Sequence, residues 1–309
     1  MIPELMAFQG VYSIIPTAFS ESGDIDEASQ RRVVDLFIEK GANGLTALGV
    51  TGEVARLEEH ERGKVLEIVV EQAAGRVPII AGTSADGTRT CIAYTRQAKE
   101  LGASAVMVSP PRMPKLNSNA VVAHYKALAD AVDLPLIVQD YPPITGFAME
   151  PALLARIAKE IPSARTIKLE DPPTPFKTAR ILDACAGTPV QIFGGLGGVF
   201  LLEELISGAT GAMTGFAFPE ILVKIMTHWN AGERDAAADV FYRAVPLMRF
   251  EFQEGIGMAI RKEVLRRRGV LASAATRGPA GALDAPTRES LDRVLAWVTS
   301  QKGMEWISV

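Results

Sequence analysis

The sequence is poor in cysteine and histidine. Its 309 residues include two cysteines, Cys91 and Cys185, and three histidines, at positions 60, 124 and 228. Two isolated cysteines cannot form a disulfide framework or a cysteine-rich metal site, and the histidines lie in separate segments without the spacing of metal ligands. We therefore expect a cytoplasmic protein that uses no metal and no other cofactor.

Long apolar runs and large blocks of one charge are also missing. No apolar run approaches the length of a membrane span, and residues 1–4 lack the basic and apolar regions of a signal peptide. The formal net charge is −4, and the short basic cluster at 266–268 lies at the end of an expected helix, where cations suit the helix dipole. Nucleic acids and membranes are therefore not expected as partners.

What the sequence does contain is a repeat of strands and helices. Hydrophobic residues make up 48% of the chain, enough for one large core. Apolar segments rich in β-branched residues recur at the roughly thirty-residue spacing of strand–helix units. The expected strands are 11–16, 44–49, 78–82, 105–109, 135–141, 165–169, 190–193 and 211–214. Segments with helical spacing lie between them, for example 58–74, 88–101 and 119–133.

Eight such units predict an α/β protein with a (β/α)8 TIM barrel over residues 1–219. A doubly wound open sheet is the main alternative, since short repeats do not themselves reveal closure. The number of repeats and the lack of an early dinucleotide-binding fingerprint favour the barrel. After residue 219 the pattern is helical, in segments 220–231, 233–248, 254–268 and 286–301. We expect residues 220–309 to form a C-terminal helical region packed on the barrel.

Lys168 is the most informative residue, because it lies within the apolar strand 165–169. A strand buried on both faces is normally apolar, so a lysine there must find a partner or lose its charge. A free amine in such a place attacks carbonyl carbon and forms a Schiff base. The alternative is a lysine at the end of the strand that reaches solvent or pairs with Glu170.

Other strand ends carry groups that suit the same chemistry, and the active site of a barrel lies at these ends. Residues 49–53 read Gly-Val-Thr-Gly-Glu, in which the N–H groups of Val50 and Thr51 and the Thr51 hydroxyl can hold a carboxylate. The alternative for this segment is a glycine turn in which Thr51 and Glu53 cap the following helix.

Strands five to seven complete this set of candidates. Gln139 and Tyr141 share one face of strand 135–141, because side chains alternate along a strand, and Glu170 shares a face with Lys168 in the same way. Gly194 and Gly195 begin a glycine-rich turn that would let a ligand approach the backbone, although a plain loop explains that turn nearly as well. Together these ends offer an amine nucleophile, an anion cradle and groups for proton transfer.

Several motifs in order along the chain carry a family resemblance. The most specific is 49–53, followed by Leu57 and Glu61-Arg62; the others are 78–83, Gly102-Ala103, 109–111, Pro142, Thr145-Gly146, Ile167-Lys168 and 208–211. The chain resembles the dihydrodipicolinate synthase and N-acetylneuraminate lyase superfamily, the pyruvate-type class I aldolases. The resemblance implies a (β/α)8 barrel, a homotetramer made of two dimers, and Lys168 as the residue that forms the imine.

The chain also departs from the pattern of this family. Gln139 stands where the family has a catalytic tyrosine on strand five, and a glutamine cannot act as an acid or base. Tyr141 and Glu170 are the candidates to replace it. The tyrosine that the synthases donate across a subunit contact is missing from 110–113, and the arginine that recognises their aldehyde substrate aligns with Ile144. Neither the synthase reaction nor neuraminate cleavage is therefore expected.

These observations predict a Schiff-base lyase, an aldolase or a dehydratase, acting on a small 2-oxo acid such as a 2-oxo-3-deoxy sugar acid. Lys168, Tyr141 and Glu170 are the predicted catalytic residues. The predicted substrate-binding residues are Val50, Thr51, Gln139, Gly194 and Gly195. The alternatives are a binding or regulatory protein that has lost turnover, a deaminase of a cyclic imino acid, and a metal- or phosphate-using barrel enzyme.

Overall fold

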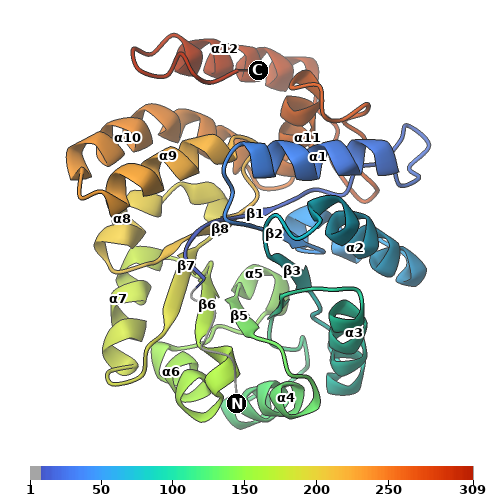
Figure 1. Ribbon diagram of the computed structural model, residues 1–309, viewed down its shortest axis with the longest axis vertical. Helices are drawn as coiled ribbons and strands as arrows, with labels where there is room; N and C mark the ends of the chain where they lie inside the picture. Colours follow the sequence, from blue (N-terminus) through green and yellow to red (C-terminus); the bar gives the residue numbers. More distant parts are fainter. Residues whose placement is uncertain (1–7, 309) are drawn as a thin grey trace.

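The computed structural model describes residues 8–308 and contains a closed barrel of eight parallel strands (Figure 1). The strands are β1 (Gly10–Ile14), β2 (Gly44–Ala47), β3 (Ile79–Gly82), β4 (Ala105–Val108), β5 (Leu136–Asp140), β6 (Thr166–Leu169), β7 (Gln191–Gly194) and β8 (Gly211–Thr214). Each strand pairs with the next, and β8 pairs with β1 in parallel register. The predicted barrel is confirmed, because this last pairing closes the sheet.

Helices surround the barrel in Figure 1 and follow the strands in sequence. They are α1 (Glu27–Glu39), α2 (Glu59–Ala73), α3 (Thr88–Glu100), α4 (Ser118–Ala131), α5 (Pro142–Thr145), α6 (Pro151–Glu160), α7 (Thr174–Ala184), α8 (Leu201–Ile206) and α9 (Pro219–Asn230). Short 3-10 turns lie at η1 (Val50–Gly52), η2 (Val54–Arg56), η3 (Pro162–Ala164) and η4 (Leu196–Gly198). Three of these short turns and α5 lie just beyond strand ends, where the candidate residues are found.

Two separate apolar clusters fill the molecule. The inner cluster consists of side chains such as Tyr12, Ile80, Met107 and Phe193, which point into the barrel, while the larger cluster lies between the strands and the helices. This arrangement follows from strands whose residues alternate between the two sides. An inner cluster of large side chains closes the barrel interior, so a ligand can enter only at the strand ends.

The remaining helices are α10 (Arg234–Glu251), α11 (Gly257–Arg267) and α12 (Ala285–Thr299). Helix α10 contacts α9, α11 and α12, and α12 lies at the edge of the molecule in Figure 1. Helix α9 contacts β1 as well as α10. The division of the chain at residue 219 stays a prediction. Within residues 8–308, no helix is both long and apolar enough to cross a membrane.

Candidate active site

Lys168 lies in the middle of β6, in a region where three strands are in register. Its neighbours across the sheet are Gln139 on β5 and Phe193 on β7. The lysine is 1% exposed, and its Nζ is 2.8 Å from Oε2 of Glu170, which follows the strand on the same face. The lysine is therefore buried and is also paired with Glu170, and its formation of an imine stays a prediction. A buried pair of this kind keeps an amine and a carboxylate in contact without bulk water.

Glu170 is held from a second side by a chain of hydrogen bonds. Gln139 donates from Nε2 to Glu170 Oε2 over 2.7 Å, and the Ser109 hydroxyl donates to Gln139 Oε1 over 2.9 Å. All four residues that these bonds connect, Ser109, Gln139, Glu170 and Lys168, are buried. Gln139 thus positions the carboxylate. The orientation of its amide is fixed because Ser109 donates to the amide oxygen and Glu170 accepts from the amide nitrogen.

The neighbouring Asp140 points to the opposite face of β5, as strand alternation predicts. Its carboxylate accepts a hydrogen bond from Lys177 on α7 over 2.6 Å and another from the backbone N–H of Met149. Burial raises the pKa of this carboxyl group, although Lys177 opposes the shift. Asp140 therefore ties the barrel to its outer helices and does not reach Lys168.

The segment 49–53 forms a tight turn above the barrel, with Val50 and Thr51 in the short 3-10 helix η1. The first N–H groups of such a helix have no carbonyl partner inside it, and those of Val50 and Thr51 donate no hydrogen bond to residues 8–308. The Thr51 hydroxyl is buried and likewise has no partner in that range. The turn is held from below by Thr17, whose hydroxyl donates to the Gly52 carbonyl over 2.6 Å.

Glu53 ends this turn in the left-handed region, at φ 56° and ψ 28°. Its buried carboxylate pairs with Lys262 of α11 and accepts hydrogen bonds from Arg56 and from the backbone N–H of Arg277. A non-glycine residue in that conformation persists only when its surroundings hold it. Glu53 is therefore an anchor for the turn and does not cap the following helix α2, whose N-cap is Glu58.

Tyr141 lies just after β5, at the start of α5, and is partly buried. Burial is the main reason that the pKa of its phenol is raised, and the nearby carboxylates Glu170 and Glu254 raise it further. The phenol therefore stays protonated at neutral pH and can donate a hydrogen bond. The structure brings Tyr141 to the same cavity as Lys168 and Glu170.

Gly194 and Gly195 lie beside two different carboxylates. A Cβ on Gly194 would overlap Glu204 of α8, whereas a Cβ on Gly195 would overlap the side chain of Glu170. The absence of a side chain at Gly195 thus allows Glu170 to lie against the backbone of the β7 loop. Substrate contact by these two glycines stays a prediction.

Two small cavities of about 60 Å³ each lie at the strand ends and share Val50. One is bordered by Thr51, Lys168, Glu170 and Tyr141, together with Gly215 and Arg261, and the other by Ser109 and Gln139. Sequence reasoning did not assign Ser109 or Arg261 to a site. Ser109 lies at the end of β4, where the strand-end rule could have found it. Arg261 comes from α11, and no local signal marked it.

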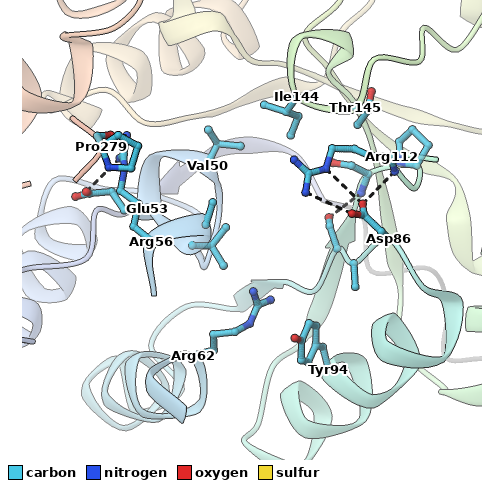
Figure 2. Close-up of a pocket in the computed structure, with 16 residues that line it drawn as sticks. Val50, Glu53, Arg56, Arg62, Asp86, Tyr94, Arg112, Ile144, Thr145 and Pro279 are labelled. Atoms are coloured by element: carbon cyan, nitrogen blue, oxygen red, sulfur yellow. Dashed lines mark hydrogen bonds and ion pairs between the residues drawn. The ribbon is translucent and has the colours of Figure 1, made fainter. Parts of the chain in front are cut away.

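A wider pocket of about 580 Å³ opens above these cavities and also includes Val50 and Ile144 (Figure 2). Its wall carries Arg62, whose guanidinium lies 4.2 Å from the centre of the Tyr94 ring. Arg112 at the rim pairs with Asp86 at 3.4 Å, as Figure 2 shows. The pocket leads from solvent to Val50 and so provides the entrance to the inner cavities.

Comparisons with known proteins identify the family to which the chain belongs. The model of the dihydrodipicolinate synthetase family matches residues 7–297. Among curated proteins, the chain is similar to the L-2-keto-3-deoxyarabonate dehydratase of Azospirillum brasilense, with 34% identity over 92% of each chain. It is also similar to the 4-hydroxy-tetrahydrodipicolinate synthase of Nitratidesulfovibrio vulgaris, with 34% identity over 81% of this chain and 85% of that one.

Solved structures give the same result for the fold. A dihydrodipicolinate synthase from Rhodopseudomonas palustris superposes with a TM-score of 0.88 at 34% identity and covers 94% of this chain and 97% of its own. A dihydrodipicolinate synthase from Thermotoga maritima has a TM-score of 0.88 at 28% identity, covering 94% and 98%. The resemblance noted from the motifs is confirmed over nearly the whole chain.

Proposed function

The chain belongs to the dihydrodipicolinate synthetase family and is a lyase acting on 2-oxo acids, and within this class we propose that it is a dehydratase. The substrate would be a 2-oxo-3-deoxy sugar acid, which forms an imine with Lys168 and then loses the hydroxyl group on C4. One observation carries the choice of dehydration: a carboxylate, Glu170, lies beside the amine and accepts a hydrogen bond from Gln139. The family resemblance places a tyrosine at the position of Gln139.

Imine formation uses the Lys168–Glu170 pair directly. The 2.8 Å contact allows the ammonium group to pass a proton to Glu170, and the free amine then adds to C2 of the oxo acid. The resulting hydroxyl group takes up a proton from the carboxyl group and leaves as water. The product is a protonated imine between Nζ and C2, which withdraws electrons from C3.

The carboxylate of the substrate would lie in the turn 50–51. This turn offers two backbone N–H groups and a buried hydroxyl that have no partner among residues 8–308, and they match the hydrogen-bonding needs of a carboxylate. Because Thr51, Lys168 and Glu170 border one small cavity, a carboxylate held there places C2 next to Nζ. The arrangement suits a 2-oxo acid, in which these two carbons are adjacent.

Elimination would follow from the same carboxylate. Glu170 removes a proton from C3, and the electrons of that bond form an enamine with C2. The enamine then expels the C4 hydroxyl, which leaves as water with the proton that Glu170 holds. The hydrogen bond from Gln139 keeps the carboxylate in place between the two steps. Tyr141, protonated at neutral pH, donates a hydrogen bond to the departing oxygen.

Carbon–carbon cleavage requires proton removal at a different position. A retro-aldol step needs a base at the C4 hydroxyl, a role that the family resemblance gives to a strand-five tyrosine. Gln139 occupies that place, and an amide neither accepts nor releases a proton at ordinary pH. Elimination needs only a base at C3 and an acid at C4, and one carboxylate serves for both in turn.

Two measurements test the proposal. Incubation with pyruvate and borohydride, followed by peptide mass spectrometry, should give a reduced adduct on Lys168, and the Lys168→Ala variant should give none. A protein that is folded but forms no adduct with pyruvate or with longer oxo acids would refute the imine. Incubation with 2-oxo-3-deoxy-pentonates and -hexonates should then give a product lighter by one water. Release of pyruvate and an aldehyde would instead show an aldolase.

Assembly and location belong to the same proposal. We propose a homotetramer made of two dimers, following the family, and a cytoplasmic location, which suits two buried cysteines that are free. Light scattering of the purified protein tests the first statement, because a tetramer has four times the chain mass of 33.1 kDa. Fractionation of cells that produce the protein tests the second.

A further inference from the structure

Arg261 is a buried arginine that borders the catalytic cavity from outside the barrel. It lies in α11, is 4% exposed, and lines the cavity that also contains Thr51, Lys168 and Glu170. Burial of a guanidinium group is costly unless its hydrogen bonds are satisfied. The partners of this group are therefore informative.

The guanidinium has one protein acceptor among the residues described. Its Nε donates to Glu251 Oε2 at 3.4 Å, a long contact, and its terminal nitrogens Nη1 and Nη2 donate no hydrogen bond to residues 8–308. An arginine that served only to stabilise its carboxylate partner would pair through two parallel hydrogen bonds at shorter distance. The terminal nitrogens are left available, and the cavity is the space that they border.

One of these nitrogens, Nη1, lies near the Thr51 hydroxyl. Both groups approach Gly215, at the end of β8: a Cβ placed there would be 2.6 Å from Thr51 Oγ1 and 3.1 Å from Arg261 Nη1. Two hydrogen-bonding groups that lack partners in the described part of the chain thus lie in one corner of the cavity. The lack of a side chain at Gly215 keeps this corner open.

Glu251 fixes the direction of the arginine. It is fully buried in α10 and accepts a second hydrogen bond from the backbone N–H of Ala217, which is two residues after Gly215. The carboxylate therefore joins α10 to the β8 loop and binds Nε of Arg261, and Glu251 does not border the cavity. The Nη1 end of the guanidinium lies beside Gly215.

We propose that Arg261 is a substrate-binding residue that donates hydrogen bonds to the C1 carboxylate of the oxo acid, together with Thr51. This inference rests on the proposed function, because it assigns the corner between Thr51 and Gly215 to the carboxylate of the molecule that Lys168 binds. It makes the C-terminal helices part of the active site. A fixed positive charge there selects acids over neutral ketones of the same shape.

Pyruvate and its methyl ester provide the test, since both carry the reactive ketone but only pyruvate carries the charge. The measurement is the concentration of each compound that gives half-maximal reduction of the Lys168 imine by borohydride. For Arg261→Met we expect this concentration to rise about tenfold or more for pyruvate, and less than about threefold for the ester. Arg268→Met is the matched control, because Arg268 is a buried arginine of the same region that contacts Ala217 and Glu220 and borders no part of the cavity.

Loss of Arg261 alone leaves Glu251 buried without its partner, which can prevent folding. The double variant Glu251→Gln/Arg261→Gln removes both charges and keeps polar groups at both positions, so it serves when the single variant does not fold. The selectivity for pyruvate is the ratio of the half-maximal concentrations of the ester and of pyruvate. A folded Arg261→Met or Glu251→Gln/Arg261→Gln variant with the wild-type ratio would overturn the proposal. An equal loss of selectivity in Arg268→Met would overturn it as well.

The two proposals can fail separately. If the wild-type protein forms no imine, the proposed function fails, and pyruvate binding is then measured by saturation-transfer NMR without borohydride. Arg261-dependent binding in that experiment supports the carboxylate site, and equal binding by wild type and Arg261→Met refutes it. If the imine forms and the pyruvate-to-ester ratio does not depend on Arg261, only the inference about Arg261 fails.

Discussion

The two sides of the catalytic cavity differ in how their polar groups are satisfied. On the side of β5 and β6, the polar ends of Lys168, Glu170 and Gln139 are bonded to one another. On the side of η1 and α11, the Thr51 hydroxyl, two backbone N–H groups and the Arg261 terminal nitrogens have no partner within residues 8–308. Buried polar groups are normally bonded, so the second side is the exception.

This difference in hydrogen bonding suits the two sides to different tasks, one to proton transfer and the other to substrate binding. A proton-transfer group must already be in place before the reaction, because ordering it during the reaction would add to the barrier. A group that binds the substrate should instead have no hydrogen bond to the protein, because such a bond would have to break before the substrate could bind. The satisfied side is therefore suited to proton transfer and the open side to holding the substrate.

The largest expected effect is on the satisfied side, in Glu170→Gln. The amide has nearly the same shape but cannot take a proton from C3, so turnover should fall about 10³-fold, within the usual range for loss of a general acid–base group. The half-saturating concentration of substrate should change little, because Glu170 does not bind the carboxylate. Steady-state kinetics provides the measurement, on a 2-oxo-3-deoxy sugar acid that the screen of the wild-type protein finds to be turned over.

Gln139→Glu is a useful companion to this variant. It keeps the size of the side chain and places a second carboxylate next to Glu170, where two like charges oppose each other. The optimum of turnover should therefore move to higher pH. A Glu170→Gln enzyme that keeps full turnover would contradict the assignment of proton transfer to this side.

A smaller effect is expected on the open side, in Thr51→Val. Valine has the shape of threonine and lacks the hydroxyl, while the two backbone N–H groups stay. The half-saturating concentration of pyruvate for imine trapping should rise about tenfold, the usual worth of one hydrogen bond to a charged group, with little change in the maximal rate. Borohydride trapping over a range of pyruvate concentrations measures both quantities.

Thr46→Val is the matched control for that variant. The Thr46 hydroxyl on β2 is also buried without a partner in the described part of the chain, but it borders neither of the two small cavities. Its removal should leave pyruvate trapping unchanged. Equal effects of the two substitutions would show that the missing partner at Thr51 has no connection with a ligand.

The sequence predicted the barrel and most of the satisfied side. The eight strands begin and end within two residues of the expected positions, because each is a short apolar run bounded by polar or glycine residues. Lys168 and Glu170 were placed on one face by alternation alone, and so were Gln139 and Tyr141. These results depend on local periodicity, which a single sequence carries directly.

The residues on the side of η1 and α11 were harder to predict from the sequence. Arg261 comes 210 positions after Thr51 in the numbering and belongs to a helix that no barrel rule assigns to a site. The role of Glu53 was also uncertain, because its capping pattern resembles that of an ordinary helix start, whereas its actual partner is Lys262 on α11. Contacts between distant segments depend on packing, and no local pattern reports them.

The smallest expected effect concerns a third group, which has an unsatisfied atom but no cavity. Glu204 on α8 is buried behind Gly194 and accepts a hydrogen bond from Thr174 on one oxygen, while its Oε2 has no partner in residues 8–308. Burial raises the pKa of this carboxyl group from 4.5 to about 8, and the nearby charges of Glu203 and Glu170 add to the shift. It faces no ligand space, so its missing partner should cost stability and have no binding role.

The direction of the pH dependence follows from the raised pKa. The folded protein holds the proton more tightly than the unfolded chain, so the stability that a neutral Glu204 provides is complete below about pH 4.5 and is lost as the pH rises towards 8. Glu204→Gln cannot ionise and should therefore be more stable than wild type by at least about 1 kcal/mol at pH 8, with a smaller difference at pH 5. Urea unfolding at the two pH values measures this, and pyruvate trapping should be unaltered. If Glu204→Gln weakens pyruvate trapping as much as Thr51→Val does, then the position of a buried polar group beside the cavity does not decide whether that group binds the substrate.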